Sequence, residues 1–238
     1  MSALSVALSA VVGALAGAVA RPVVFARSVP APASFRSRCP ACAHHLLARP
    51  RLLPVSGRCP KCNERIGPAA LSVELTMAAA FAAVAAGGAT GWFAAAQYWF
   101  AACGIALAVI DVAVQRLPDA LTVPACTGTL LLLTAAAVAG EPGSLGRAAA
   151  AAAAVTAAFL LLALLAEMGM GDVKFAPAIG ALLGWSSWRN ALWGTVAGFL
   201  FGLVAAVALL VSGRGRRTRL AFGPFMVIGA LAATVTIG

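Results

Sequence analysis

Two aspartates stand at the ends of apolar stretches, where a charged side chain is unexpected. The chain of 238 residues has only seven acidic residues. Asp111 ends the apolar run 101–110, and Asp172 follows the glycine-rich sequence Gly169-Met-Gly171. If these runs lie in a membrane, an ionisable side chain at the edge of the hydrocarbon costs up to about 3 kcal/mol unless it has water or a partner, so it indicates a functional site.

Two carboxylates brought close together can divide the work of peptide hydrolysis. Like charges at short range do not both ionise, so one group can activate water while the other, protonated, polarises a carbonyl, as in aspartic proteases. Gly169 and Gly171 remove side chains where an extended substrate backbone would approach. The sequence therefore predicts Asp111 and Asp172 as the catalytic pair, supported by Gly169 and Gly171.

Asp119 is the alternative to Asp111 as the first catalytic carboxylate. It follows Pro118, a residue that suits a helix start, and an anion is favourable in the first helical turn. We therefore interpret Asp119 as structural or substrate-orienting. Lys174 is expected either to hold Asp172 ionised or to reach the membrane surface with its ammonium group.

Four of the six cysteines form a second chemical motif, Cys39-Pro-Ala-Cys42 and Cys59-Pro-Lys-Cys62. Two C-x-x-C knuckles separated by 16 residues are typical of a tetrahedral structural zinc site, because each knuckle presents two thiolates to one ion. Two disulfides are the competing interpretation. His44 and His45 follow the first knuckle and are alternative ligands, but four thiolates already complete the shell. Cys103 and Cys126 are expected to pack between helices.

The elements that must position these groups are membrane helices. Hydrophobic residues make up 62% of the chain and charged residues 10%, with a mean hydropathy of +0.97. Apolar runs of about 20 residues, the length that crosses a bilayer, recur along the chain. We expect an all-α membrane protein with eight spans at 3–20, 71–90, 92–112, 120–140, 148–168, 173–188, 190–212 and 220–238.

The chain has a net charge of +10. The distribution of its basic residues indicates that this charge faces a membrane surface rather than nucleic acid. Of the 17 Lys and Arg, nine lie in 21–70 and four in 214–219. Alternating the eight spans places 15 of them on one side, leaving only Arg147 and Arg189 on the other. The positive-inside rule makes that side cytoplasmic and puts both termini across the membrane.

This topology gives three parts: a first transmembrane helix over 1–20, a cytoplasmic Cys₄ zinc-binding module over 21–70, and a seven-helix peptidase domain over 71–238. The cytoplasm is reducing, which disfavours disulfides in the module. Asp111 and Asp172 both emerge at the cytoplasmic ends of their spans and can share one depth. The lipid bilayer is the solvent of most of the chain.

Motifs along nearly the whole chain resemble those of the bacterial type IV prepilin peptidases, also called leader peptidase/N-methyltransferases. They occur in the family's order: Arg38-Cys-Pro-Ala-Cys42, Leu53-Pro54, Gly57-Arg-Cys-Pro-Lys-Cys62, Val73-Glu74, Asp111 to Asp119 ending in Leu-Pro-Asp, Gly169-Met-Gly-Asp-Val-Lys174 and Phe222-Gly-Pro-Phe225.

The resemblance implies a GxGD-type aspartic peptidase of the bacterial inner membrane, with Asp111 and Asp172 as its catalytic pair. Such an enzyme cleaves the basic leader from prepilins of type IV pili or pseudopilins of type II secretion on the cytoplasmic side. Many members also methylate the new N-terminus with S-adenosylmethionine. Here the first span reads Gly13 to Arg21 without the asparagine of the family's usual segment, so a peptidase lacking methyltransferase activity is the alternative.

Two other function classes place carboxylates in or near membrane spans. A transporter or channel would carry them at the midplane between inverted repeats of broken helices, a pattern this sequence does not show. A non-enzymatic assembly scaffold would use the zinc module to dock partners. Cleavage of a prepilin distinguishes the peptidase from both.

Overall fold

The computed structural model describes residues 2–30, 32–33, 35–47, 53–166, 168–212 and 220–236, so the basic stretch 214–219 lies outside the described residues. Within these ranges the chain forms helices and no strand, which confirms the predicted all-α class. The helices are α1 (Ala3–Arg27), α2 (Ser72–Ala86), α3 (Gly91–Val114), α4 (Asp119–Val138), α5 (Leu145–Ala166), α6 (Met170–Ser186), α7 (Trp188–Val211) and α8 (Gly223–Thr236).

Five of the described helices, α1, α3, α4, α5 and α7, are long and apolar enough to cross a membrane, so the chain is a multi-pass membrane protein. The others are shorter: α2 has 15 residues, α6 has 17 and α8 has 14. At 1.5 Å per residue these span about 21 to 26 Å, less than the hydrocarbon thickness of about 30 Å. All eight correspond to the runs predicted from the sequence.

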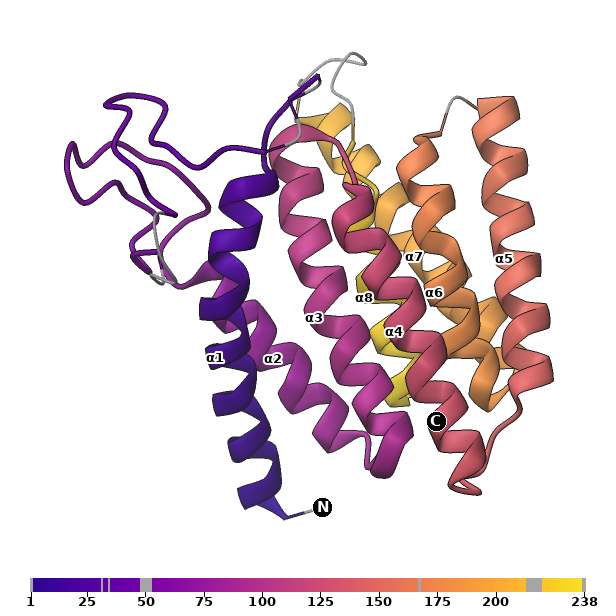
Figure 1. Cartoon of the computed structure of the whole chain (residues 1–238). Coiled ribbons are helices and arrows are strands. Elements are labelled where there is room, and N and C mark those ends of the chain that lie inside the picture. The colour runs from indigo at the N-terminus through magenta and orange to yellow at the C-terminus, as the bar shows by residue number, and fades with distance from the viewer. Residues whose placement is uncertain are drawn as a thin grey trace.

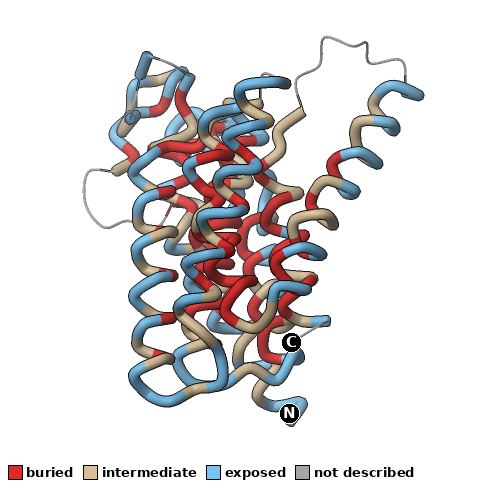
Figure 2. The backbone as a smooth tube through the Cα atoms, turned by 90° about the vertical axis from the view of Figure 1, so that its right-hand side faces the viewer, coloured by how far each residue is buried: buried red, intermediate tan, exposed pale blue. Residues whose placement is uncertain are grey.

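The helices stand side by side, with the cysteine-bearing segment between α1 and α2 at one end of the bundle and the start of α1 and end of α8 at the other (Figure 1). Buried residues concentrate along the middle of the bundle, and exposed ones face outward (Figure 2). In the most apolar window of α3, 67% of residues are buried, against 11% in α1 and 17% in α7. Among these long helices α3 is therefore the most buried, and the exposed apolar faces of the outer helices suit contact with lipid.

Helices α1 and α2 form a tightly packed antiparallel pair. A Cβ added at Gly13 would lie 2.6 Å from the Met77 carbonyl oxygen, and one at Gly17 would lie 2.6 Å from Glu74 Cα. Small residues let membrane helices approach this closely. Arg21 and Glu74 form a bidentate pair with N–O distances of 2.6 and 2.7 Å.

The Arg21–Glu74 pair shows why α1 runs past Ala20, the boundary expected for the first span. Arg21 is 2% exposed and faces Glu74 of α2. Its guanidinium also donates to the carbonyls of Pro68 and Ala69, just before α2 begins. With that charge neutralised inside the helix pair, the helix continues to Arg27. The pair ties the end of α1 to the segment that precedes α2.

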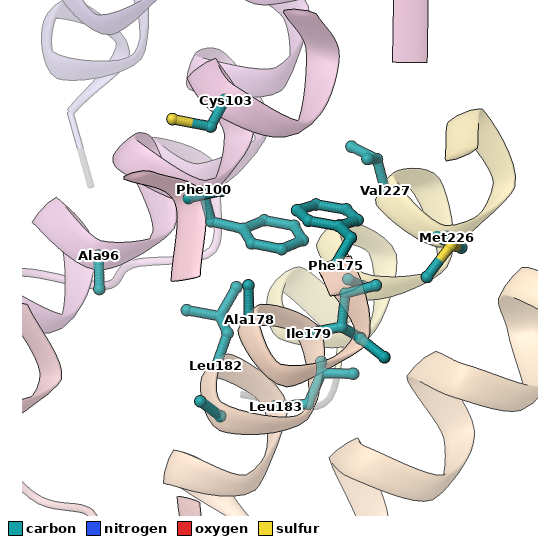
Figure 3. Close-up of a cluster of buried hydrophobic side chains, with 14 of the residues drawn as sticks. Ala96, Phe100, Cys103, Phe175, Ala178, Ile179, Leu182, Leu183, Met226 and Val227 are labelled. Atoms are coloured by element: carbon teal, nitrogen blue, oxygen red, sulfur yellow. The ribbon is translucent and has the colours of Figure 1, made fainter. Parts of the chain in front are cut away.

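The helices that carry the two aspartates pack through a stacked aromatic pair. Phe100 of α3 and Phe175 of α6 have ring centroids 5.4 Å apart at an interplanar angle of 9°. Val227 of α8 lies beside them (Figure 3), and a Cβ at Gly104 would lie 2.9 Å from its side chain. Contacts among α3, α6 and α8 thus fix the relative position of the helix ends where Asp111 and Asp172 lie.

Candidate active site and metal site

Asp111 lies in the last turn of α3 and is 6% exposed. The helix ends at Val114 because Gln115 adopts the left-handed conformation at φ 52°, which turns the chain toward α4. The Asp111 Oδ2 atom accepts a hydrogen bond of 2.8 Å from the backbone N–H of Gly223, the first residue of α8. Helices α3 and α8 therefore meet at this carboxylate.

Asp172 lies in the first turn of α6 and is 7% exposed. Its backbone N–H donates to the Gly169 carbonyl at 3.0 Å, which closes the turn that begins the helix. A Cβ at Gly169 would face the Asp172 carboxylate at 3.4 Å, whereas one at Gly171 would lie 2.9 Å from Leu117 Cβ. Gly171 is thus explained by packing against the α3–α4 turn, and Gly169 lies beside the carboxylate.

One cavity of about 900 Å³ brings the predicted site residues together. Asp111, Asp119, Asp172 and Lys174 all line it, together with Gly169, Gly171 and the α3–α4 turn. This volume is in the range of ligand sites, about 300 to 1,000 Å³. Two carboxylates from helices far apart in the sequence therefore face one space.

Lys174 pairs with Asp119 rather than with Asp172. Its Nζ lies 2.7 and 3.0 Å from the two Asp119 carboxylate oxygens. The side chains are 52% and 63% exposed, respectively, so the pair sits at the open side of the cavity. Asp119 is the first residue of α4, after Pro118, where the helix dipole favours its charge.

The four knuckle cysteines converge on one point. Their Sγ atoms all lie within 4.8 Å of one another, and the Cys39–Cys62 and Cys42–Cys59 distances are both 3.7 Å. A tetrahedral ion with metal–sulfur bonds of about 2.3 Å requires edges of about 3.8 Å. The thiols are free, not joined in disulfides. The set fits a metal ion such as zinc, and the histidines are not members of it.

The two knuckles repeat one local structure. The backbone N–H of Cys39 donates to the His44 carbonyl and that of Cys59 to the Glu64 carbonyl, each at 2.9 Å. The residue after each second cysteine is left-handed, Ala43 at φ 55° and Asn63 at φ 59°. Phe25, Leu46, Leu53 and Ile66 pack beneath the cysteines as a small core.

The sulfurs are too close together to ionise independently. Burial would raise the pKa of the Cys59 thiol, but hydrogen bonds from the backbone at Cys62 and Lys61 and from the neighbouring thiols together lower that pKa to about 7. At Cys62 a backbone hydrogen bond at Glu64 lowers the pKa of the thiol. Burial and the neighbouring sulfurs raise it by more, so that the pKa is about 12. A cation among the sulfurs would remove this repulsion.

The contact between the Gly223 N–H and Asp111 is one that the sequence alone does not identify. The motif of Gly223, Phe222-Gly-Pro-Phe225, belongs to the family resemblance, but its sequence assigns it no role. A glycine at the first position of a helix, directly before a proline, was the available signal, but nothing local indicates which side chain its N–H meets. That partner, Asp111, is 112 positions away.

Fold and site together define a multi-pass helical membrane protein with a carboxylate-lined cavity at the end of the bundle that carries a Cys₄ cluster. The sequence profile of the type IV leader peptidase family matches residues 98–213. The profile of the bacterial peptidase A24 N-terminal domain matches residues 9–87, which include most of α1, the Cys₄ segment and α2.

Several curated relatives are similar over most of their length, all called prepilin leader peptidase/N-methyltransferase. That of Burkholderia pseudomallei is 34% identical over 221 residues, covering 85% of this chain and 67% of the relative. That of Aeromonas hydrophila is 32% identical, covering 83% and 70%, and that of Neisseria gonorrhoeae is 29% identical, covering 81% and 68%. No solved structure matches the chain. The chain belongs to the type IV leader peptidase family.

Proposed function

We propose that the chain is an aspartic endopeptidase that removes the leader peptide of type IV prepilins or pseudopilins, with Asp111 and Asp172 as its catalytic pair. The observation that carries the proposal is that these two carboxylates, from α3 and α6, face one cavity. The family and the names of the relatives supply the substrate class.

Hydrolysis in this cavity needs no group beyond water and the two carboxylates. The ionised aspartate takes a proton from water as the oxygen attacks the scissile carbonyl, and the protonated one donates to the carbonyl oxygen. The proton taken from water then passes to the leaving amine as the C–N bond breaks, and one hydroxyl of the tetrahedral intermediate returns its proton to the other aspartate as the carbonyl re-forms. The Gly223 N–H would hold the Asp111 carboxylate in position throughout.

The test is substitution of each aspartate by asparagine. Asp111→Asn or Asp172→Asn should abolish prepilin processing, because an amide neither takes nor gives the proton. In the Asp111→Asn variant the amide oxygen can still accept from the Gly223 N–H, so the protein should stay inserted and folded. The double variant should be little worse than either single one, because residues acting as one unit are non-additive.

Asp119→Asn is the matched control on the same cavity. Asp119 is 63% exposed and paired with Lys174, so its loss should slow processing without abolishing it. Processing is read as a mobility shift of a co-expressed prepilin in isolated membranes. Full processing by Asp172→Asn would refute the mechanism. Full processing by Asp111→Asn with none by Asp119→Asn would make Asp119 the first catalytic residue.

The proposed orientation places the Cys₄ segment and the cavity in the cytoplasm, with the protein in the bacterial inner membrane. It is supported by the excess of Lys and Arg in 21–70. A thiol reagent that does not cross membranes should not label that segment in intact cells, and should label it in inverted vesicles. Labelling from outside would reverse the topology.

We propose that the Cys₄ cluster holds structural zinc. The support is the close approach of four Sγ atoms above a core of only a few side chains. A segment this small commonly depends on metal for its fold. Zinc would cross-link the two knuckles, while the catalytic pair lies on helices elsewhere, so metal loss should unfold the segment before it stops cleavage.

The second large cavity lined by the described residues offers S-adenosylmethionine no anionic partner. That donor carries a sulfonium and an ammonium cation, and sites for ribose commonly offer a carboxylate to its hydroxyls. Beside the catalytic cavity the described residues line a second large one, and its only charged residues are Arg36 and Arg65. Two cations repel a cationic ligand. This second cavity therefore does not suit the methyl donor.

The prepilin assay also separates the peptidase from the other classes. A transporter or an assembly scaffold would leave the substrate uncleaved in membranes that contain the wild-type chain. The carboxylates lie at helix ends rather than mid-span, which supports the peptidase over a midplane transport site.

A further inference from the structure

The second cavity has a volume of about 990 Å³ and shares no lining residue with the catalytic one. It lies between the Cys₄ segment, α2, α3 and α8. Helix α3 separates the two spaces, since Asp111 faces the catalytic cavity while Val112 and Ala113 line the other. The proposed peptidase chemistry therefore does not use it.

One side of this cavity is apolar and follows the membrane helices. Ile105, Val109 and Val112 of α3 line it, opposite Val227 and Ile228 of α8. Ile105 lies nine residues before the end of α3, a depth of about 14 Å along the helix. Val112 is 67% exposed and Ile228 is 50% exposed, so the groove is open to the surroundings of the bundle.

The loop end of the cavity is polar and positively charged. Arg36 and Arg65 line it, and the described residues offer neither of them a carboxylate partner. Arg36 donates to the carbonyls of Phe25 and Ile66, and burial lowers its pKa from the ordinary value. Ser28 also lines this end, and its hydroxyl is buried with no hydrogen-bond partner in the described part of the chain.

We propose that this groove binds an anionic phospholipid of the surrounding bilayer, with its phosphate at Arg36 and Arg65 and an acyl chain along α3 and α8. A guanidinium binds phosphate through paired N–H donors. Basic pockets between membrane helices at the bilayer surface suit anionic headgroups. The combination of a cationic mouth and an apolar floor in one groove matches both halves of the lipid.

Arg65 and Arg58 provide a matched pair of variants. They face each other in one isolated β-bridge, both are exposed, and each donates to one backbone carbonyl, Gly67 and Asn63 respectively. Only Arg65 lines the groove. Arg36 is left unchanged, because its bonds to Phe25 and Ile66 hold the segment together.

The experiment titrates the full-length protein in neutral detergent with palmitoyl-oleoyl phosphatidylglycerol and counts bound lipid by native mass spectrometry. Arg65→Gln should weaken binding about fivefold, the effect of one basic residue near an anionic surface. Arg58→Gln should change it less than about twofold. Phosphatidylcholine should bind more weakly than phosphatidylglycerol to the unaltered chain.

Filling the groove gives an independent test. Ala113→Trp places an indole in the groove from an exposed position and should abolish the tightest bound phosphatidylglycerol. Ala157→Trp, at an exposed position of α5 outside both cavities, should not. A photoreactive acyl chain should cross-link to α3 and α8. Unchanged binding in Arg65→Gln and Ala113→Trp, equal binding of phosphatidylcholine, or cross-links elsewhere would overturn the proposal.

Discussion

Gly223→Ala tests whether the backbone of α8 positions the candidate catalytic carboxylate. An added Cβ would lie 3.0 Å from Asp111 Oδ2, 3.3 Å from its Cβ and 3.4 Å from its Cγ. Ordinary van der Waals contact begins near 3.4 Å, so the oxygen must retreat by about 0.4 Å. Its 2.8 Å hydrogen bond from the Gly223 N–H is strained by the same movement.

The magnitude follows from the sensitivity of catalysis to position. A misplacement of about 1 Å costs about a hundredfold, so about 0.4 Å corresponds to about sixfold if the barrier rises in proportion. Weakening a hydrogen bond to a charged group adds to this loss. We expect prepilin processing to slow by about tenfold overall.

The fold should not suffer, which separates this effect from simple destabilisation. Gly223 has no positive φ, so alanine there gains up to about 1 kcal/mol by restricting the unfolded chain, which offsets the cost of the close contact. The control is Gly146→Ala in the first turn of α5, where the nearest atom to an added Cβ is 3.9 Å away. Processing rates are measured in membranes, and thermal stability is measured on purified protein. A wild-type rate for Gly223→Ala, or an equal loss for Gly146→Ala, would refute the positioning role.

Three further predictions concern the Cys₄ segment and the cavity mouth. Purified protein should contain about one zinc per chain, and Cys59→Ser should lower the metal content and increase proteolysis of the segment; metal-free, intact protein would contradict a structural zinc. Ala43→Gly should stabilise the segment by about 1 kcal/mol, because Ala43 is left-handed at φ 55°, whereas Ala41→Gly should not; equal shifts in thermal unfolding would argue against backbone strain. Lys174→Met should weaken processing no more than Asp119→Asn does, because the two form one exposed pair worth up to about 1 kcal/mol; complete loss of activity in Lys174→Met would instead give the lysine a direct role in catalysis.

The helical membrane class and the residues able to do chemistry follow from the amino-acid sequence alone. Apolar runs of bilayer length leave few alternatives, because backbone groups in lipid must be satisfied within a helix. The spacing of the cysteines was equally informative, since two short knuckles constrain their own geometry. Asp119 at the start of α4 was also predictable, because the proline before it and the helix dipole act locally.

Which distant groups meet depends on how the helices pack against one another. Lys174 could serve Asp172 on the basis of sequence distance, but the packing of α4 against α6 gives it to Asp119. Arg21 looked like the first loop residue, yet the close approach of α1 and α2 buries it against Glu74. The Gly223 N–H reaches Asp111 because α8 packs on α3, although α4 to α7 lie between them in the sequence. Such contacts depend on how helices associate, and apolar faces of similar composition do not specify their neighbours from sequence alone.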